Sequence, residues 1–158
     1  MRCAIGSDDR GPLTEALLDE LERRAIEVGR YGALAESGPA TICPEPVALR
    51  QAQDDIGWAS IGRAVGEEVA HGRADVGIVC CWTGTGISIA ANKVRGVRAA
   101  LCADAATAEG ARRWNDANVL ALSLRATSPA VGREILSAFL ATASSEDAAD
   151  RRSIEAVE

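Results

Sequence analysis

The sequence predicts a single α/β domain built on a five-stranded parallel sheet with helices on both of its faces. Short apolar runs alternate along the chain with longer segments in which apolar residues recur at helical spacing. The runs are apolar throughout, which is typical of strands that are covered on both faces. The chain has 158 residues, of which 47% are hydrophobic and 25% charged, so it can bury one core and keep a solvated surface.

Each expected element follows from a local pattern. Strands are expected where the apolar runs are short, over residues 2–5, 28–34, 76–81, 97–102 and 117–124. Helices are expected over residues 13–28, 54–71, 87–94, 104–114 and 128–142. Gly72 is expected to end the second helix, and the Gly-, Pro- and Ser-rich segment 35–53 to form a loop. The domain is expected to cover residues 1–143. The charged tail over 144–158 is either a frayed terminus or an arm that packs on a partner subunit.

The composition argues against several classes of partner and cofactor. The formal net charge of -6 does not provide the basic footprint that nucleic acids require. No apolar run reaches the roughly 18 residues of a membrane span, and the N-terminus has no signal-peptide pattern. The five cysteines include no CxxC pair and there is one histidine, so neither a disulfide framework nor a metal site is indicated. We expect a cytoplasmic protein that uses no metal or cofactor and binds neither nucleic acid nor membranes.

Polar and reactive side chains follow three of the expected strands. In sheets of this type, ligands bind at the carboxyl ends of the strands. Asp8 and Asp9 follow the first strand, the segment 81–86 starts at the end of the third, and Arg125 follows the fifth. Asn115 ends the helix before the fifth strand and is expected to lie near them. These strand ends are therefore the predicted site.

The chemistry centres on the turn after the third strand, which reads CWTGTG from Cys81 to Gly86. A glycine-containing turn that leads into a helix presents backbone N–H groups to an anion. Neither a Walker A loop nor a GxGxxG pattern is present. A thiol at the start of a helix forms a thiolate readily, so Cys81 could take a proton from carbon while the N–H groups stabilise the enediolate oxygen. Thr83 could hydrogen-bond a substrate oxygen. The alternative is a tight strand–helix turn without a catalytic role.

The same segment carries a family resemblance. The run CWTGTGISIAANKVRGVRAALC over 81–102 and the run ARRWNDANVLALSLR over 111–125 resemble the ribose-5-phosphate isomerase B / galactose-6-phosphate isomerase family. The opening IGSDD resembles its IGSDH, and the likeness extends over roughly residues 1–140. The resemblance implies a Rossmann-like three-layer α/β/α sandwich. It also implies a cofactor-independent aldose–ketose isomerase that acts on a small, phosphorylated sugar as a homodimer or homotetramer with sites shared between subunits.

The resemblance also implies residue roles. Cys81 matches the proton-transferring base and Thr83 a threonine that assists ring opening. Asp8 matches a residue that binds substrate hydroxyls, Asn115 one that contacts the sugar, and Arg125 one that contacts phosphate. The anion-stabilising turn corresponds to Gly84 and Gly86. Apart from the resemblance, Thr85 within that turn and Asp9 beside Asp8 are also expected to bind substrate.

Several positions depart from the family pattern. Trp114 and Asp9 stand where the family has histidines, and Trp82 stands where it has a glycine. Arg151 and Arg152 lie in a different register from the family's C-terminal arginines. The simplest interpretation is enediol chemistry on a substrate that is open-chain or shorter. The competing interpretation is a catalytically weak or inactive sugar-phosphate-binding partner subunit.

Structural interpretations compete at other positions. Because strand side chains alternate between faces, Cys81 is expected to face the turn and Cys80 to pack under a helix. His71 is expected at a helix end, where a cation complements the helix dipole, and Trp58 is expected to pack. Asp9 could instead cap the helix that begins near residue 12.

Overall fold

A five-stranded parallel sheet forms the middle layer of the computed structural model, which describes residues 1–35 and 57–157. The strands are β1 (Arg2–Ser7), β2 (Glu27–Gly32), β3 (Val76–Cys81), β4 (Ala99–Leu101) and β5 (Val119–Ser123). The helices are α1 (Pro12–Arg23), α3 (Trp58–Ala70), α4 (Thr85–Ala91), α5 (Ala105–Asn115), α6 (Pro129–Ala141) and α7 (Ala148–Glu155).

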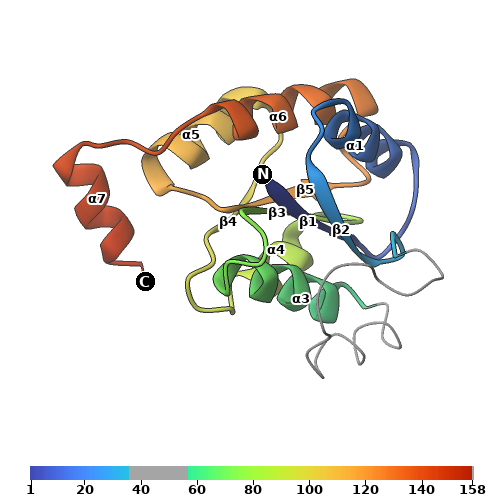
Figure 1. Ribbon diagram of the computed structural model, residues 1–158, viewed down its shortest axis with the longest axis horizontal. Helices are drawn as coiled ribbons and strands as arrows, with labels where there is room; N and C mark the ends of the chain where they lie inside the picture. The colour runs from blue at the N-terminus through green and yellow to red at the C-terminus, as the bar shows by residue number, and fades with distance from the viewer. Residues whose placement is uncertain (36–56, 158) are drawn as a thin grey trace.

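The strands are all parallel and follow the order β2-β1-β3-β5-β4. Helices α3 and α4 cover one face of the sheet, and α1, α5 and α6 cover the other (Figure 1). The predicted Rossmann-like three-layer α/β/α sandwich is confirmed. The central strand β3 is buried at all six positions, as expected for a strand covered on both faces.

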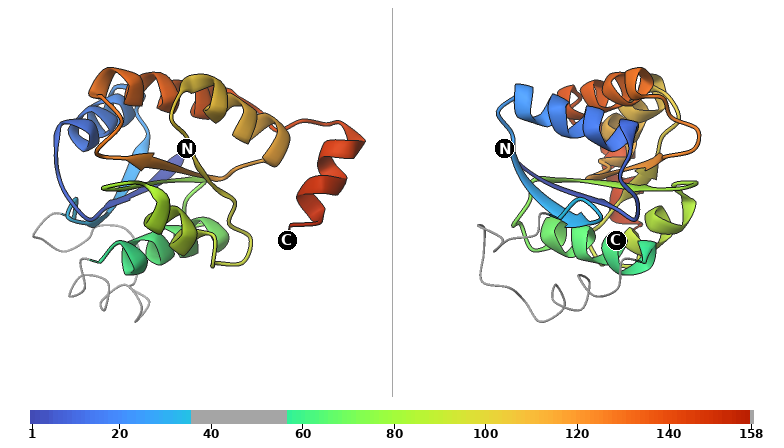
Figure 2. Two further views of the ribbon diagram at one scale, coloured as in Figure 1. Left: turned by 180° about the vertical axis from the view of Figure 1, so that it is seen from behind. Right: turned by 90° about the vertical axis from the view of Figure 1, so that its right-hand side faces the viewer.

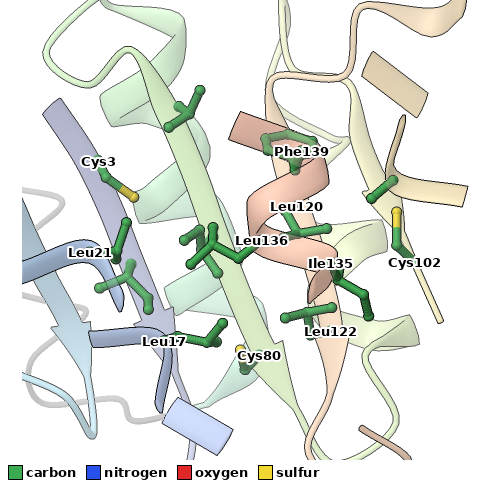
Figure 3. Packing of buried hydrophobic residues seen from close by; sticks show 14 of the residues in the cluster. Cys3, Leu17, Leu21, Cys80, Cys102, Leu120, Leu122, Ile135, Leu136 and Phe139 are labelled. Atoms are coloured by element: carbon green, nitrogen blue, oxygen red, sulfur yellow. The ribbon is translucent and has the colours of Figure 1, made fainter. Parts of the chain in front are cut away.

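Two aliphatic clusters fill the spaces between the layers. The larger one packs β1, β3 and β5 against α1, α5 and α6 around Leu17, Leu136 and Phe139 (Figure 3). The smaller one lies under α3 and α4 and includes Ile61 and Ile87. Successive residues of each strand point to opposite faces of the sheet, so the position of a residue along its strand determines which of the two clusters its side chain enters.

Two predicted helices have different ends. The first was expected to reach residue 28 but stops at Arg23, and Ala25 then turns the chain with a φ of 53°. Ile26 and Val28 continue the helical apolar spacing in the sequence, but they pack against the core from the segment that enters and forms β2. Helix α4 begins at Thr85, two residues earlier than expected, because Gly84 provides its N-cap.

The end of α3 agrees with the prediction, whereas β4 is shorter than the expected range 97–102 and α4 ends at Ala91, before the expected residue 94. Gly72, with a φ of 68°, follows α3 as the predicted stop, and His71 caps the helix end. The predicted loop beyond residue 35, the start of the second helix at 54–56 and Cys43 lie outside the described residues.

The tail contains a helix instead of a frayed end. Helix α7 lies beside the end of α5, apart from the sheet, and none of its residues is buried (Figure 2). That it packs on a partner subunit stays a prediction. Within the described part of the chain, no helix has the length and apolarity needed to cross a bilayer.

Candidate active site

The carboxyl ends of β1, β3 and β5 meet at one edge of the sheet. Strand β3 pairs with β1 up to Ser7 and with β5 up to Ser123, so the segments that follow these strands are neighbours. Arg125 is exposed at this edge, and its backbone N–H donates to the carbonyl oxygen of Trp82 over 3.0 Å. The structure therefore brings the three predicted strand ends together.

Gly84 closes the turn between β3 and α4. Its N–H donates to the carbonyl of Cys81 over 3.2 Å, and its φ of 76° lies in the left-handed region. A Cβ atom at this position would lie 2.5 Å from Cδ1 of Leu101 and 2.9 Å from the carbonyl of Leu122. Only glycine combines this conformation with this approach, so Gly84 is what allows α4 to begin directly at the sheet edge.

The start of α4 gathers hydrogen-bond donors. The first backbone N–H groups of a helix have no partner within it, and here they belong to residues 85–87, because the N–H of Ser88 is the one that reaches Gly84, over 3.2 Å. The hydroxyls of Thr83 and Thr85 are 2.7 Å apart and exposed beside them. Such a cluster can stabilise an oxygen that becomes negative during a reaction.

Cys80 and Cys81 face opposite sides of the sheet, as predicted. Cys80 is fully buried in the cluster that contains Leu17 and Leu122, and burial raises the pKa of its thiol (Figure 3). Cys81 belongs to the other cluster, with Ile87 of α4, and is 4% exposed. The register therefore places Cys81 on the same side as the first turn of α4, whereas its role as a base stays a prediction.

Asp8 carries a buried oxygen that accepts no hydrogen bond among the described residues. This atom is Oδ1. Burial raises the pKa of the Asp8 carboxyl and the nearby charge of Asp9 adds to the rise, while the backbone N–H of Asp8 opposes it. Leaving a buried acceptor unpaired is costly. A substrate hydroxyl that donates to Oδ1 would supply the missing bond.

Asp9 is exposed next to Asp8 at this edge. Its Oδ1 accepts the N–H of Arg10 over 2.8 Å. Helix α1 is capped by Gly11, whose N–H donates to the hydroxyl of Thr14 over 3.0 Å. The alternative that Asp9 caps this helix is therefore wrong, and its side chain remains accessible to a ligand.

Asn115 lies at the opposite edge of the sheet from Cys81. Helix α5 starts after the carboxyl end of β4 and ends at Asn115, just before β5 begins at Val119. A helix that connects two parallel strands runs back to their amino ends, so the expectation that Asn115 lies near the other site residues of its own chain is wrong. Asn115 and Trp114 are both exposed there.

Comparisons with known proteins agree with this geometry. Residues 3–157 match the family model Ribose/Galactose Isomerase. The chain belongs to this family. YwlF, a putative sugar phosphate isomerase of Bacillus subtilis, is 34% identical over 146 residues, which cover 90% of this chain and 85% of the relative. D-erythrulose-4-phosphate isomerase of Pectobacterium atrosepticum is 32% identical over 138 residues, covering 87% and 80%. The structure of Clostridium thermocellum ribose-5-phosphate isomerase B matches with a TM-score of 0.81 and 33% identity, covering 99% of this chain and 95% of that one.

Trp58 is a site neighbour that the sequence interpretation assigned only to packing. It is the first residue of α3 and is 46% exposed. Its ring lies against Gly86, where an added Cβ would be 3.0 Å from the nearest ring atom. The signal available in the sequence was topological, because a helix that precedes a parallel strand begins at the carboxyl edge. Trp58 therefore lines one side of the turn in this isomerase-family chain.

The single histidine lies far from this turn. His71 caps α3 at the amino edge, where its Nδ1 is 2.7 Å from the carbonyl oxygen of Glu67. Within residues 1–35 and 57–157, no three side chains of the types that bind metals come together.

Proposed function

We propose that this protein interconverts the aldose and ketose forms of a small sugar phosphate through an enediolate, without a cofactor, and with Cys81 as the base. The observation that supports this most directly is the register of β3. It puts the Cys81 side chain on the α4 side of the sheet, directly before the strand–helix turn that leads to the free N–H groups of residues 85–87. Membership of the Ribose/Galactose Isomerase family points to the same chemistry.

The proposed reaction moves one proton between neighbouring carbons. The Cys81 thiolate removes the proton from the carbon next to the substrate carbonyl, and the carbonyl oxygen becomes an enediolate oxygen held by the N–H groups of Thr85 and Gly86. A proton passes between the two substrate oxygens, with the Thr83 hydroxyl and the unpaired Asp8 Oδ1 as hydrogen-bond partners. The thiol then returns its proton to the other carbon, which regenerates the thiolate. Arg125 supplies a cation for the phosphate.

We propose further that the preferred substrate is already open-chain. A pentose phosphate must open its ring before a proton can be removed, and ring opening needs a proton donor and acceptor near neutral pH. The one histidine of this chain caps the end of α3, where its Nδ1 lies 2.7 Å from the carbonyl oxygen of Glu67, and the indole N–H of Trp114 only donates. A four-carbon sugar 4-phosphate cannot close a five-membered ring, because the phosphate occupies O4 in the aldose form and the chain beyond the carbonyl is too short in the ketose form. The related D-erythrulose-4-phosphate isomerase is named for a substrate of this kind.

The active form is proposed to be at least a homodimer in the cytoplasm. Asn115 is expected to contact the sugar but lies at the opposite edge from its own Cys81, so a second copy would have to provide it. Large apolar side chains, Trp82, Ile89 and Leu101, are exposed at or near the carboxyl edge and α4, which is unusual for a surface that faces only water. Helix α7 is the other segment proposed to pack on that copy. Light scattering that shows a monomer at micromolar concentration would contradict this assembly.

The deciding experiment is hydrogen exchange from heavy water into a panel of aldoses and ketoses, with and without phosphate. Exchange at the carbon next to the carbonyl is expected for at least one sugar phosphate, since it reports enediolate formation even when net conversion is slow. Binding of a sugar phosphate without any exchange would instead support the inactive partner subunit. If no member of the panel bound to the protein or exchanged hydrogen, the proposal would be refuted.

A further inference from the structure

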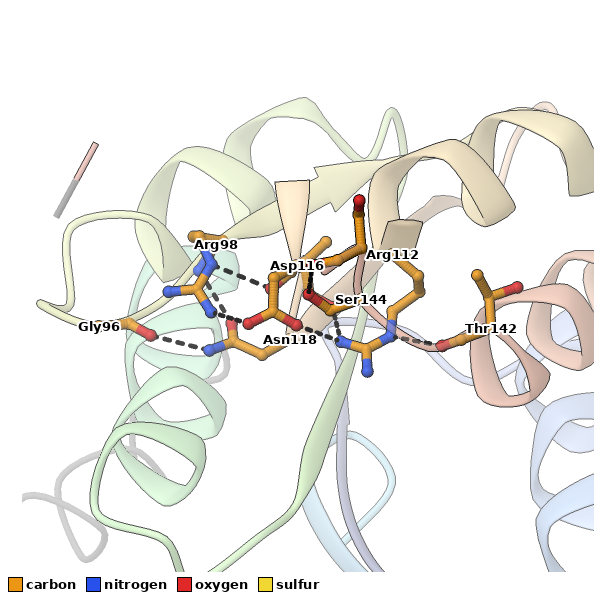
Figure 4. Close-up of polar contacts among 9 residues, drawn as sticks. Gly96, Arg98, Arg112, Asp116, Asn118, Thr142 and Ser144 are labelled. Atoms are coloured by element: carbon orange, nitrogen blue, oxygen red, sulfur yellow. Dashed lines mark hydrogen bonds and ion pairs between the residues drawn. The ribbon is translucent and has the colours of Figure 1, made fainter. Parts of the chain in front are cut away.

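Asp116 is held between two arginines where α5 ends (Figure 4). Its Oδ2 accepts from Nη2 of Arg98 over 2.8 Å, and its Oδ1 lies 3.4 Å from Nη1 of Arg112. Nε of Arg98 also donates to the backbone carbonyl of Asp116 over 2.9 Å. Both arginine side chains are only 18% exposed, so these ion pairs are shielded more than ordinary surface pairs. We call these three residues the Asp116 clamp.

The clamp holds a backbone conformation that aspartate adopts at a cost. Asp116 has φ 45° and ψ 44°, in the left-handed region. This region costs a residue with a side chain about 1–2 kcal/mol, less for Asp and Asn than for most others. Such a conformation persists where the surroundings determine it. The clamp therefore acts together with the backbone bond from the N–H of Ala117 to the carbonyl of Ala111, over 3.0 Å, in fixing the direction in which the chain leaves α5.

Further bonds anchor the clamp to three elements. Arg112 donates to the carbonyls of Ala117 and Thr142, over 2.5 and 3.4 Å, which ties it to the ends of α5 and α6. Asn118 accepts the backbone N–H of Arg98 and donates to the carbonyl of Gly96, each over 2.8 Å, on the approach to β4 (Figure 4). The corner cannot rotate without breaking several of these bonds.

This corner exposes the side chains of Asn115 and Trp114. Asn115 is exposed, and its side chain makes no hydrogen bond with the described residues. Trp114 is 55% exposed, with its ring laid over Gly110, where a Cβ would lie 2.8 Å from the ring. An ordered turn that exposes an unpaired amide and an indole is suited to contact with another molecule.

We propose that Asp116 is a positioning residue for the reaction: the Asp116 clamp holds the Trp114–Asn115 turn in the orientation in which Asn115 enters the site of a second copy. This inference rests on the proposed isomerase function. The amide of Asn115 then contacts the sugar that is bound beside the partner subunit's Cys81. In return, the partner subunit's Asn115 contacts the sugar that is bound beside Cys81 of the first chain. Asp116 acts only through Asn115 and touches no substrate.

The test variant is Asp116→Asn, because asparagine keeps the size of the side chain and tolerates the left-handed conformation. It removes the charge that both arginines bind. We expect hydrogen exchange into the substrate to fall about ten- to a hundredfold, since small misplacements of a contacting group have effects of that size. Asp75→Asn is the matched control: it removes another aspartate–arginine pair, with Arg2, at the same edge of the sheet, and should leave exchange unchanged.

The decisive measurement uses heterodimers of Asp116→Asn with Cys81→Ala, co-expressed with two different affinity tags and purified through both. If Asp116 serves the partner's site, one site of each heterodimer has both an intact Cys81 and an intact clamp. Activity should then return to about half that of the wild-type dimer. If Asp116 only stabilises its own chain, the heterodimer will be no more active than the Asp116→Asn homodimer, and the proposal is wrong.

Two further measurements distinguish a failure of the Asp116 proposal from a failure of the proposed isomerase function. Heterodimers of Asn115→Ala with Cys81→Ala should be restored in the same way. Restoration of this pair without restoration of the Asp116 pair would overturn the role of the clamp but leave the proposed function standing. A wild-type protein that exchanges no hydrogen with any sugar phosphate would overturn the proposed function itself. Arg98→Lys, which removes the Nε bond to the Asp116 carbonyl but keeps the charge, replaces Asp116→Asn in the same heterodimer if that variant does not fold.

Discussion

Two adjacent cysteines offer a matched pair of substitutions for testing the base. Cys81→Ala removes the proposed proton acceptor beside the first turn of α4, and loss of a general base typically slows a reaction by about 10²–10⁴-fold. Cys80→Ala makes the same chemical change one residue earlier, on the other face of β3. Since Cys80 is fully buried, removal of its sulfur leaves a small cavity, and the substitution is expected to lower the free energy of unfolding by about 1 kcal/mol.

The assay pairs hydrogen exchange in heavy water with denaturant unfolding of both variants. Cys81→Ala is expected to fold and lose exchange, whereas Cys80→Ala is expected to keep exchange and lose some stability. If Cys81→Ala kept full exchange while Cys80→Ala lost it, the conclusion that the reaction takes place on the α4 face of β3 would be wrong. If a confirmed activity survived both changes, the cysteine mechanism would have to be abandoned.

Alkylation by iodoacetamide gives an independent measure, because the thiolate is the reactive form. Burial raises the pKa of Cys102 to about 11 and that of Cys3 to about 12. Both thiols are therefore almost entirely protonated at pH 8. Cys81 should label faster than both, and bound substrate should protect it. A Cys43→Ser background removes the cysteine that lies outside the described residues.

Three further predictions follow from the same edge of the sheet. Gly84→Ala should cost about 2–5 kcal/mol of unfolding free energy, combining the left-handed conformation with overlap against Leu101. Gly72→Ala, with φ 68° and nothing within 4 Å of the added Cβ, should show only the conformational part, about 1–2 kcal/mol, and equal losses would refute the close approach. The raised pKa of Asp8 means that the folded state binds the Asp8 proton more tightly than the unfolded state does. The contribution of Asp8 to the free energy of unfolding therefore falls as pH rises from its unfolded-state pKa through its folded-state pKa. Asp8→Asn should therefore stabilise the protein at neutral pH but not in acid, while exchange falls; a gain that is independent of pH would contradict this. Erythrulose 4-phosphate should exchange faster than ribose 5-phosphate, and equal rates would refute the open-chain proposal.

The layers of this fold could be predicted from the sequence because apolar runs and helical spacing are local signals. Strand β3 spans the residues expected, since its apolar run is bounded by Asp75 and by the turn at Gly84. The end of α1 was missed, because Ile26 and Val28 satisfy a helical pattern and a buried strand equally well. A short apolar segment does not distinguish these two states without its neighbours in space.

Parts of the candidate site depend on contacts that no local pattern records. The unpaired Oδ1 of Asp8 and the approach of Leu101 to Gly84 exist because distant segments meet at the sheet edge. The clamp around Asp116 joins residues 98, 112 and 116, and the local sequence around Asp116 does not indicate that Arg98 takes part in it. The position of Asn115 at the amino edge, in contrast, follows from the order of β4, α5 and β5 along the chain.

The proposed dependence on a second copy has its physical reason in that topology. Cys81 ends a strand at the carboxyl edge, and Asn115 ends a helix at the amino edge, so the sheet itself separates them. No loop movement within one chain can remove that separation without taking the sheet apart, whereas a second copy can present its Asn115 to the first. Activity per chain should therefore fall when the protein is diluted below the dissociation constant of the assembly, while the fold measured by circular dichroism persists. Constant activity per chain across a dilution series in which light scattering shows dissociation to monomers would mean that Asn115 has no part in the reaction.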